Sequence, residues 1–293
     1  MSSNISFAFF GTGPLAESVL ATLHREGFIP KLLVTKPDSA QGRHLQITAP
    51  HIKTWCDMKG IEVYQPNSLR EIGTDSPLHT QKFDVFIVAS YGKIIPDEIL
   101  NIPKLGVLNV HPSLLPKYRG ASPIESALLD GCEETGVTII KLDNDVDHGP
   151  ILVQTAFTID NRATAGTLEI TCGQVGGELL TQVLSLYIEG DLIPKEQEHA
   201  QATFCKKIEK EMGAIKLSDN AHDVRNKFRA LTPWPSIYFF QEHKGKNIRV
   251  KINSLDLTTD LASNAIAKEI ILTVTPEGKK EMGFKSFLLG YEN

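Results

Sequence analysis

The sequence predicts an α/β domain built on a mostly parallel sheet, followed by a small β-rich domain. Three observations lead to this prediction. Over the first 190 residues, short runs that are apolar throughout alternate with helical patterns, as is typical of strands covered by helices on both faces. Beyond residue 221 the pattern changes to short strands separated by turn residues. The length of 293 residues is too great for one ordinary core and fits two domains.

The first domain begins with a strand and a helix. Residues 5–10 form a run of strand length that is apolar except for Ser6. The turn Gly11-Thr12-Gly13 follows, and then a helical pattern runs from Pro14 to Arg25. Residues 31–35 predict a second strand, which Lys36-Pro37-Asp38 ends.

The remainder of the first domain adds four strands and one long helix. Apolar or extended runs at 85–89, 107–110, 137–142 and 151–157 predict the strands. Residues 164–187 predict the helix, because apolar residues recur along one stripe at helical spacing and Gly190 marks the end. The stripe consists of Leu168, Val175, Leu179, Leu180, Val183 and Leu184.

The second domain starts after a predicted linker. Pro194 and the polar residues 195–202 have the composition of a connecting segment. The expected domains are therefore 1–190 and 204–293, joined by a linker over 191–203. Within the second domain we expect helices over 221–231 and 284–289, and strands over 237–240, 248–252 and 270–274. Pro233-Trp234-Pro235 ends the first of these helices.

Composition excludes several classes of protein. With 41% hydrophobic and 22% charged residues, the chain is neither disordered nor fibrous. No run of 18 apolar residues is present, so no membrane span is expected, and the N-terminus carries no secretion signal. The four cysteines lie far apart without any Cys-x-x-Cys. They are expected to be buried thiols of a cytoplasmic protein, forming neither disulfides nor a zinc site.

Charge is distributed unevenly along the chain. Residues 1–194 carry a net charge of −8, residues 195–253 carry +5 and residues 254–293 carry −2. A basic segment after an acidic domain suggests contact with a polyanion. A solvated lysine-rich surface is the simpler alternative, and charge alone favours it.

Two motifs in the first domain have simple structural explanations. Gly11-x-Gly13-x-x-Ala16 lies between a strand and a helix, as in dinucleotide-binding turns. The acidic residue expected about 20 residues further on is poorly placed, because Asp38 lies 27 residues beyond Gly11. We therefore favour a packing turn over NAD binding. The acids of residues 143–147 resemble part of a calcium loop but lack its spacing, and a solvated acidic turn is the alternative.

The most informative segment is 109–120. Asn109 and His111 alternate with apolar residues at the end of a strand, so they should point to the same side of it. Ligands of open α/β sheets bind at the carboxyl ends of strands. Two prolines stiffen the loop that follows, and a glycine ends it. The alternative is that both side chains merely cap the strand. A carboxylate beside His111 would favour a catalytic role over a capping role, because it could orient the imidazole for general-base catalysis.

Taken together, these motifs identify a resemblance to the methionyl-tRNA formyltransferase family that extends from Ile5 almost to Asn293. The Asn-x-His-Pro-Ser-Leu-Leu-Pro string with a later Asp-x-Gly is specific to folate-dependent formyltransferases, including those that act on amino sugars. Total length, residues 207–211 and the basic second domain favour the tRNA acceptor. The matching segments are 9–12, 36–38, 89–96, 109–120, 143–149, 207–211, 233–235 and 276–280.

The resemblance implies a Rossmann-like formyltransferase domain and an OB-like C-terminal β-barrel that binds tRNA. It implies formyl transfer from 10-formyltetrahydrofolate to the amino group of methionyl-tRNA(fMet), for translation initiation, without a metal. Asn109, His111 and Asp147 would be the catalytic residues. Asn109 would donate to the oxyanion of the tetrahedral intermediate, His111 would take the amine proton, and Asp147 would hold the imidazole tautomer.

The resemblance also implies binding residues and partners. The folate site would include Ser113, Leu114, Leu115 and Pro116, and the tRNA site would include Arg43, Lys206, Lys207 and Lys210. A cytoplasmic monomer is expected. Two alternatives remain open, namely a formyltransferase acting on an amino-sugar nucleotide and a non-catalytic tRNA-binding relative. The intact Asn109, His111 and Asp147 argue against the second.

Two departures from the family pattern bear on tRNA binding. The loop around Arg43 continues as Gly42-Arg43-His44-Leu45, where the family has another glycine and lysines, which suggests fewer contacts to RNA. The stretch between Ile252 and Ile270 is shorter than in the family. A reduced barrel with a smaller RNA surface is therefore expected.

Overall fold

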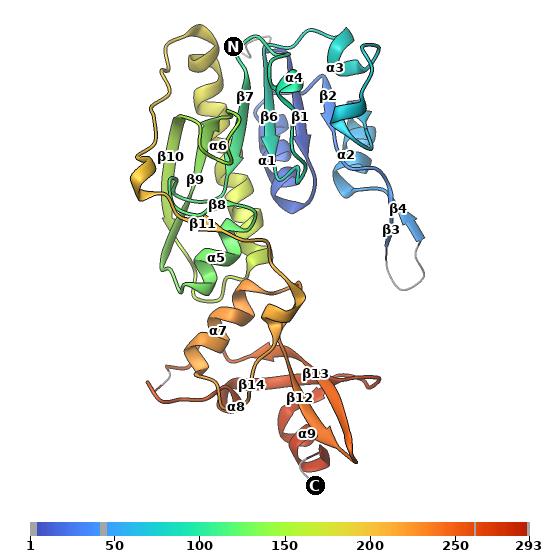
Figure 1. The fold of residues 1–293 in the computed structure, drawn as a ribbon, viewed down its shortest axis with the longest axis vertical. Coiled ribbons are helices and arrows are strands. Elements are labelled where there is room, and N and C mark those ends of the chain that lie inside the picture. Colours follow the sequence, from blue (N-terminus) through green and yellow to red (C-terminus); the bar gives the residue numbers. More distant parts are fainter. Residues whose placement is uncertain (1–4, 42–45, 261, 292–293) are drawn as a thin grey trace. The chain divides into compact units, whose positions relative to one another are not determined.

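The computed structural model describes residues 5–41, 46–260 and 262–291 (Figure 1). The chain divides into two compact units. Unit 1 consists of Met1–Ala121, Gly136–Phe157 and Glu169–Phe204. Unit 2 consists of Ser122–Thr135, Thr158–Leu168 and Cys205–Asn293. The domain limits expected from the sequence, with a linker over 191–203, stay a prediction.

Unit 1 is built on a seven-stranded sheet with the order β10-β9-β7-β6-β1-β2-β5. The neighbours β1 and β2, β1 and β6, β2 and β5, and β6 and β7 are parallel, whereas β7 and β9 are antiparallel. The mostly parallel sheet predicted from the sequence is therefore confirmed. Its strands are β1 (Phe7–Gly11), β2 (Leu32–Val34), β5 (Glu62–Tyr64), β6 (Val85–Ala89), β7 (Val107–His111), β9 (Glu134–Lys141) and β10 (Ile151–Thr158).

The first strand and helix follow the sequence pattern closely. All five residues of β1 are buried, and α1 runs from Pro14 to Arg25 as predicted. At Gly11 an added Cβ would lie 2.6 Å from the Ala16 Cβ and 2.9 Å from the Ala89 carbonyl oxygen. Glycine is therefore needed for helix-to-strand packing at this turn. The preference for a packing turn over NAD binding stays a prediction.

One face of the sheet is covered by α1 and the long helix α6 (Ala165–Glu189). Glycines of α6 allow this helix to approach α1 and β7 closely. A Cβ added at Gly173 would lie 2.6 Å from the Leu15 carbonyl oxygen, and one added at Gly176 would lie 2.4 Å from Cγ1 of Val110 on β7. Val110 therefore points toward α6.

The opposite face of the sheet carries a second apolar cluster, which includes Phe10, Phe86, Val88, Tyr91 and Val107. Val107 of β7 belongs to this cluster. Because side chains alternate along a strand, Asn109 and His111 face the same side as Val107. The other elements of unit 1 are β3 (Ser39–Gln41), β4 (Gln46–Thr48), α2 (His51–Lys59), η1 (Leu69–Glu71), α3 (Pro77–Thr80), α4 (Asp97–Leu100), β8 (Arg119–Gly120) and η2 (His199–Gln201).

Unit 2 contains a four-stranded antiparallel sheet with the order β12-β13-β14-β15. The small β-rich domain predicted from the sequence is thus confirmed, and its closure into a barrel stays a prediction. The elements are α5 (Pro123–Leu129), α7 (Ala221–Ala230), β12 (Tyr238–His243), β13 (Lys246–Leu255), α8 (Ala267–Ile270), β14 (Ile271–Pro276), β15 (Met282–Gly283) and α9 (Phe284–Tyr291), with η3 (Lys210–Gly213) before α7. The strand β11 (Phe204–Cys205) lies where the two units meet in the sequence.

Aromatic packing and helix contacts complete unit 2. Phe239 of β12 meets Phe284 and Phe287 of α9 edge to face, at centroid distances of 6.2 and 5.8 Å. The helix α5 packs on α7 although the two are distant in sequence. In the described part of the chain, no helix is both long and apolar enough to cross a membrane.

Candidate active site

Asn109 and His111 lie on β7 and point away from α6. Val110, between them, packs against the helix, so the alternation of the strand places its two neighbours on the opposite face. The sequence-based expectation that Asn109 and His111 share one side of the strand is met. His111 is almost fully buried, whereas Asn109 is half-buried.

Asp147 joins these two residues from the turn between β9 and β10. The Asn109 amide Nδ2 donates to Asp147 Oδ1 at 3.3 Å. The Nδ1 atom of His111 lies 3.6 Å from the same oxygen. The side chains of His111 and Asp147 are only 4% and 13% exposed. The fold therefore gathers the three residues that the sequence motifs singled out, although Asp147 is 38 positions from Asn109.

The tautomer of His111 is set by the backbone of Tyr118. Its Nε2 atom lies 2.9 Å from the Tyr118 carbonyl oxygen. A carbonyl can only accept a hydrogen bond, so Nε2 carries the hydrogen. Nδ1 is left facing the Asp147 carboxylate at a distance too long for a hydrogen bond. The expectation that Asp147 holds the tautomer thus differs from the geometry, in which the Tyr118 carbonyl does so.

The carboxylate of Asp147 is oriented by two donors. The Gly120 backbone N–H donates to Oδ2 at 2.8 Å, while Asn109 donates to Oδ1. Asp147 itself has a φ of +48°, in the left-handed region that aspartate tolerates better than most residues. An unusual backbone conformation at a residue so fully bonded is typical of a functional position.

The loop expected to line a folate site is rigid. The Thr138 hydroxyl donates to the Ser113 carbonyl at 2.6 Å and accepts from the Leu115 N–H at 3.2 Å. Ser113 and Leu115 are themselves buried, whereas Leu114 and Pro116 are partly exposed. The loop can therefore offer a ligand its backbone and the side chains of Leu114 and Pro116.

The acidic turn before β10 does not converge on a cation. Asp143 accepts from the Asp145 N–H at 3.0 Å and pairs with His148 Nδ1 at 2.7 Å, so its oxygens serve the turn itself. Among the residues that the structure describes, no group of three or more His, Cys, Asp or Glu side chains is arranged to hold a metal ion. None of the four cysteines, which all lie among the described residues, takes part in a disulfide.

Sequence reasoning missed a buried glutamine beside the site. The Gln197 amide donates to the carbonyl oxygens of Asp147 and Gly149, at 2.9 and 2.7 Å. Its oxygen accepts from the buried Arg119 guanidinium. Gln197 lies in the polar stretch that resembled a linker, and nothing in that composition distinguishes a buried amide from an exposed one.

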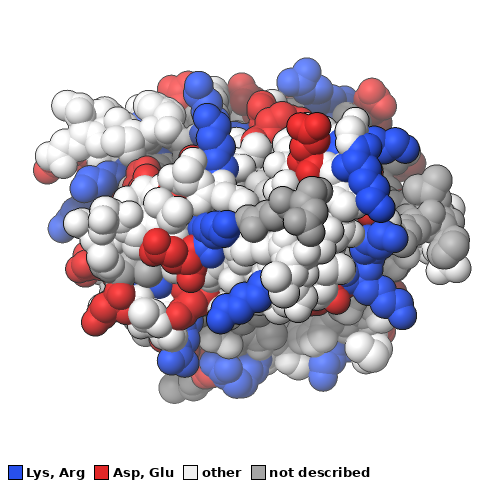
Figure 2. Space-filling view, turned by 90° about the horizontal axis from the view of Figure 1, so that it is seen from below, with Lys and Arg blue, Asp and Glu red and all other residues white. Residues whose placement is uncertain are grey.

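The residues expected to contact tRNA come from two separate stretches of the sequence. Arg43 lies outside the described residues. Lys206, Lys207 and Lys210 are exposed at the start of the C-terminal segment. In the face drawn in Figure 2, Lys and Arg side chains are spread over the surface with acidic groups among them.

Comparison with known families gives two matches along the chain. Residues 3–184 match the family described as formyl transferase. Residues 207–270 match the family described as formyl transferase, C-terminal domain. Among curated relatives, a methionyl-tRNA formyltransferase of Caldanaerobacter subterraneus subsp. tengcongensis is 35% identical over 97% of this chain and 96% of that protein. One of Dictyoglomus thermophilum is 36% identical over 97% of this chain and 96% of that protein.

Solved structures share the fold at lower identity. HypX from Aquifex aeolicus in complex with tetrahydrofolic acid has a TM-score of 0.67 and 15% identity, covering 98% of this chain and 47% of that chain. An N-formyltransferase from Helicobacter canadensis, in complex with folinic acid and dTDP-3-aminofucose, has a TM-score of 0.59 and 20% identity. That match covers 86% of this chain and 88% of that chain. At these identities the likeness concerns the fold alone.

Proposed function

The chain belongs to the methionyl-tRNA formyltransferase family, and on that premise we propose that it transfers the formyl group of 10-formyltetrahydrofolate to the amino group of methionyl-tRNA. The observation that carries the proposal is the cluster of Asn109, His111 and Asp147 at the end of β7. A base and an amide donor that lie 3.6 and 3.3 Å from one carboxylate oxygen are the groups that acyl transfer to an amine requires.

His111 would take the proton that the amine loses as its nitrogen bonds to the formyl carbon. The tetrahedral intermediate would then break the bond between that carbon and N10 of the folate, and tetrahydrofolate would leave with a proton on N10. Because Nε2 is bonded to the Tyr118 carbonyl, Nδ1 is the atom that can accept a proton. The proton would arrive on the side that faces Asp147, whose carboxylate oxygen is 3.6 Å away. The negative charge would then stabilise the imidazolium, as a carboxylate does in acyl-transfer triads.

Asn109 would bind the oxygen that becomes negative when the amine attacks the formyl carbon. An asparagine amide has two N–H groups. One of them donates to Asp147 Oδ1, which fixes the plane of the amide and leaves the other for a ligand. A donor held in place beforehand is the arrangement that stabilises an oxyanion, and such donors contribute about 10²- to 10³-fold in rate.

The loop Ser113–Pro116 fits a folate binder. Its backbone is fixed by Thr138 and by Gln154, whose amide donates to the Leu115 carbonyl at 2.9 Å. A stiff loop with partly exposed apolar side chains suits the reduced pteridine of tetrahydrofolate, because the loop needs little ordering on binding. Folate would supply the formyl group, and the chain's own residues would hold it near His111.

The proposal also covers the residues that contact tRNA, the oligomeric state and the location in the cell. Arg43, Lys206, Lys207 and Lys210 would contact phosphates of initiator tRNA. The protein would act as a monomer in the cytoplasm, apart from membranes. Sedimentation at working concentration tests the monomer directly, and a stable dimer would refute it.

An acceptor assay tests the proposal. Purified protein is given 10-formyltetrahydrofolate with methionyl-tRNA or with a panel of amino-sugar nucleotides, and the formylated product is identified by mass spectrometry. Formylation of methionyl-tRNA alone is the expected result. Formylation of an amino sugar in its place would favour the rival enzyme of the same chemistry. Binding of tRNA without turnover would favour a non-catalytic relative.

A further inference from the structure

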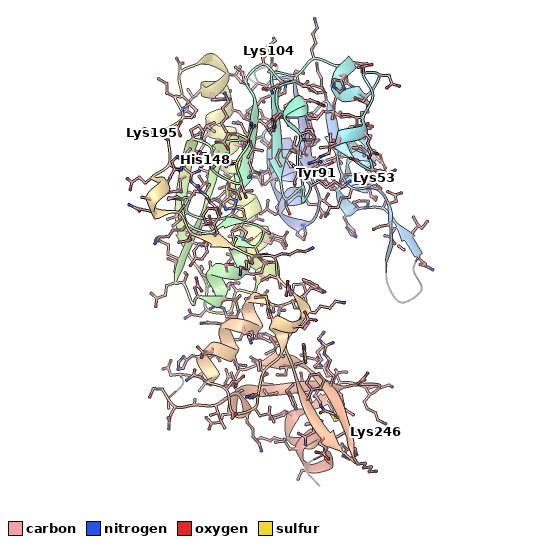
Figure 3. The ribbon with its side chains drawn as sticks, in the orientation of Figure 1. Lys53, Tyr91, Lys104, His148, Lys195 and Lys246 are labelled. Atoms are coloured by element: carbon pink, nitrogen blue, oxygen red, sulfur yellow. The ribbon has the colours of Figure 1, made fainter. Side chains whose placement is uncertain are left out.

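We propose that residues 195–203, which resemble a linker in sequence, position the catalytic Asp147 and His111. This inference rests on the proposed function for its activity readout. The segment runs along the edge strand β10, where Lys195 and Ile151 exchange backbone hydrogen bonds of 2.8 and 2.7 Å (Figure 3). A plain tether between domains would need no such contacts.

Gln197 is the contact between this segment and Asp147. Its side chain is buried, and its amide bridges the carbonyls of Asp147 and Gly149. These two carbonyls flank the left-handed turn that aims the Asp147 carboxylate. Holding both carbonyls fixes the turn from the backbone side, while Gly120 and Asn109 fix the carboxylate from the other.

Arg119 decides which way the Gln197 amide points. Its Nε and Nη2 atoms lie 3.2 and 2.6 Å from the amide oxygen. A guanidinium only donates, so the oxygen of Gln197 must face Arg119 and the NH₂ group must face the two carbonyls. The assignment of the amide therefore follows from its neighbours. Arg119 is itself buried, which makes the pair costly to leave unmatched.

Thr203 makes the corresponding contact toward His111. Its hydroxyl accepts from the Tyr118 N–H at 2.8 Å, and its carbonyl accepts from the Arg119 N–H at 2.9 Å. Tyr118 supplies the carbonyl that bonds His111 Nε2, and it does so from a left-handed conformation with φ +59°. The segment thus holds the turn that fixes the imidazole tautomer as well as the turn that carries Asp147.

The middle of the segment is also docked. The ring of His199 stacks on that of His148 at a centroid distance of 4.0 Å and an angle of 2°. His199 Nδ1 lies 2.9 Å from Arg119 Nη2, so it accepts from that guanidinium. Contacts at Lys195, Gln197, His199 and Thr203 leave the segment little freedom to move independently of the site.

The variant Gln197→Glu separates positioning from packing. Its carboxylate keeps the shape and still accepts from Arg119, but it places an oxygen against the carbonyls of Asp147 and Gly149 and cannot donate to them. We expect kcat for formylation by the folded protein to fall about 10- to 100-fold, with the KM for folate close to wild type. The melting temperature should fall as well, because two carbonyls lose their donor. Gln201→Glu is the matched control, because Gln201 is exposed in the same segment and contacts neither carbonyl.

A wild-type kcat in Gln197→Glu would overturn the proposal, and so would a loss of folding without a change in the kcat of the folded fraction.

Thr203→Val adds a readout that needs no substrate. In ¹⁵N NMR the His111 ring should be protonated at Nε2 in the wild type and become a mixture of tautomers in this variant. An unchanged His111 tautomer contradicts positioning through Thr203. Failure of the wild type to formylate methionyl-tRNA would instead count against the proposed function, and the NMR result would still stand.

Discussion

The two ring nitrogens of His111 have different surroundings. This difference predicts which substitutions lower the kcat of formyl transfer. Nε2 is committed to a backbone carbonyl, so only Nδ1 can exchange a proton with substrate. His111→Ala removes the base, and Asp147→Asn removes the charge that stabilises its protonated form. Each should lower kcat by about 10²- to 10⁴-fold while leaving folate affinity close to wild type, because both act on the transferring proton. Steady-state kinetics and calorimetric titration with folate measure the two quantities.

The control for this prediction lies in the same turn. Asp145→Asn makes the same change of charge two positions away, at an exposed residue outside the catalytic cluster, and should leave kcat unchanged. If His111→Ala and Asp147→Asn raise only KM, the three residues serve binding and are misassigned as catalytic.

The clustering of the three residues that we propose as catalytic could be anticipated from the sequence because their signals are local. Strand alternation pairs Asn109 with His111, and the motif around Asp147 supplies the third member. Gln197 and Tyr118 could not be predicted in the same way. The first acts through a buried amide in a polar stretch, and the second through a backbone carbonyl that any residue carries. Both contributions arise only when distant segments pack together.

At the scale of elements, sequence patterns predicted where helices and strands lie in the chain. They predicted less well how the strands pair with one another. The helix over 14–25 and the strand over 85–89 have the predicted bounds, because their burial is uniform or strictly periodic. The short α2 and β5 were not predicted, and their sequences are mostly exposed or mixed in character. That β9 runs antiparallel to β7 follows from tertiary pairing, to which the composition of a strand gives no guide.

The approach of α6 to α1 gives an element-scale prediction about stability. A methyl group at Gly173 would lie 2.5 Å from the Ser18 Cβ and 2.6 Å from the Leu15 carbonyl oxygen, so the two helices would have to separate. Gly173→Ala should therefore destabilise unit 1 by about 1–3 kcal/mol. Gly290→Ala is the control, since nothing lies within 4 Å of its added methyl group. That variant should gain up to about 1 kcal/mol from helix propensity. Urea unfolding measures both, and effects of equal sign would contradict the close packing.

The helix α5 carries a carboxyl whose charge opposes folding. Burial raises the pKa of Glu125 above its ordinary value of 4.5, with a smaller opposing effect from a backbone hydrogen bond. The folded state therefore binds this proton more tightly than the unfolded chain. Its contribution to stability is fully present below pH 4.5 and is lost as the pH rises through the raised pKa of the folded state.

Glu125→Gln removes that pH dependence. The variant should be more stable than wild type at pH 7.5, by on the order of 1 kcal/mol, and the difference should vanish as the pH approaches 4.5. Thermal unfolding across this pH range measures the effect. Glu134→Gln, at an exposed position of the same unit, serves as the control. A variant that is less stable than wild type at pH 7.5 would show that the Glu125 carboxylate contributes favourable contacts.

For the whole molecule, the separation of charge along the chain distinguishes a tRNA substrate from a small one. The cluster that we propose as catalytic lies in unit 1, whereas the basic residues Lys206, Lys207 and Lys210 lie in unit 2. An amino sugar needs only the first. A tRNA also carries many phosphates, so the basic residues outside unit 1 should matter only for that acceptor.

We therefore expect kcat/KM for methionyl-tRNA to fall steeply as the salt concentration rises. Each phosphate contact to a single strand adds a slope of about −0.7 in log K against log salt, so three contacts give a slope of about −2 in kcat/KM. Changing Lys206, Lys207 and Lys210 together to Glu should lower kcat/KM and flatten that slope while leaving folate binding intact. The same number of reversals at the exposed Lys31, Lys59 and Lys82 of unit 1 controls for net charge. If the Lys206/Lys207/Lys210 variant keeps the wild-type rate and slope, these lysines form only a solvated surface, and the tRNA contacts must lie elsewhere on the chain.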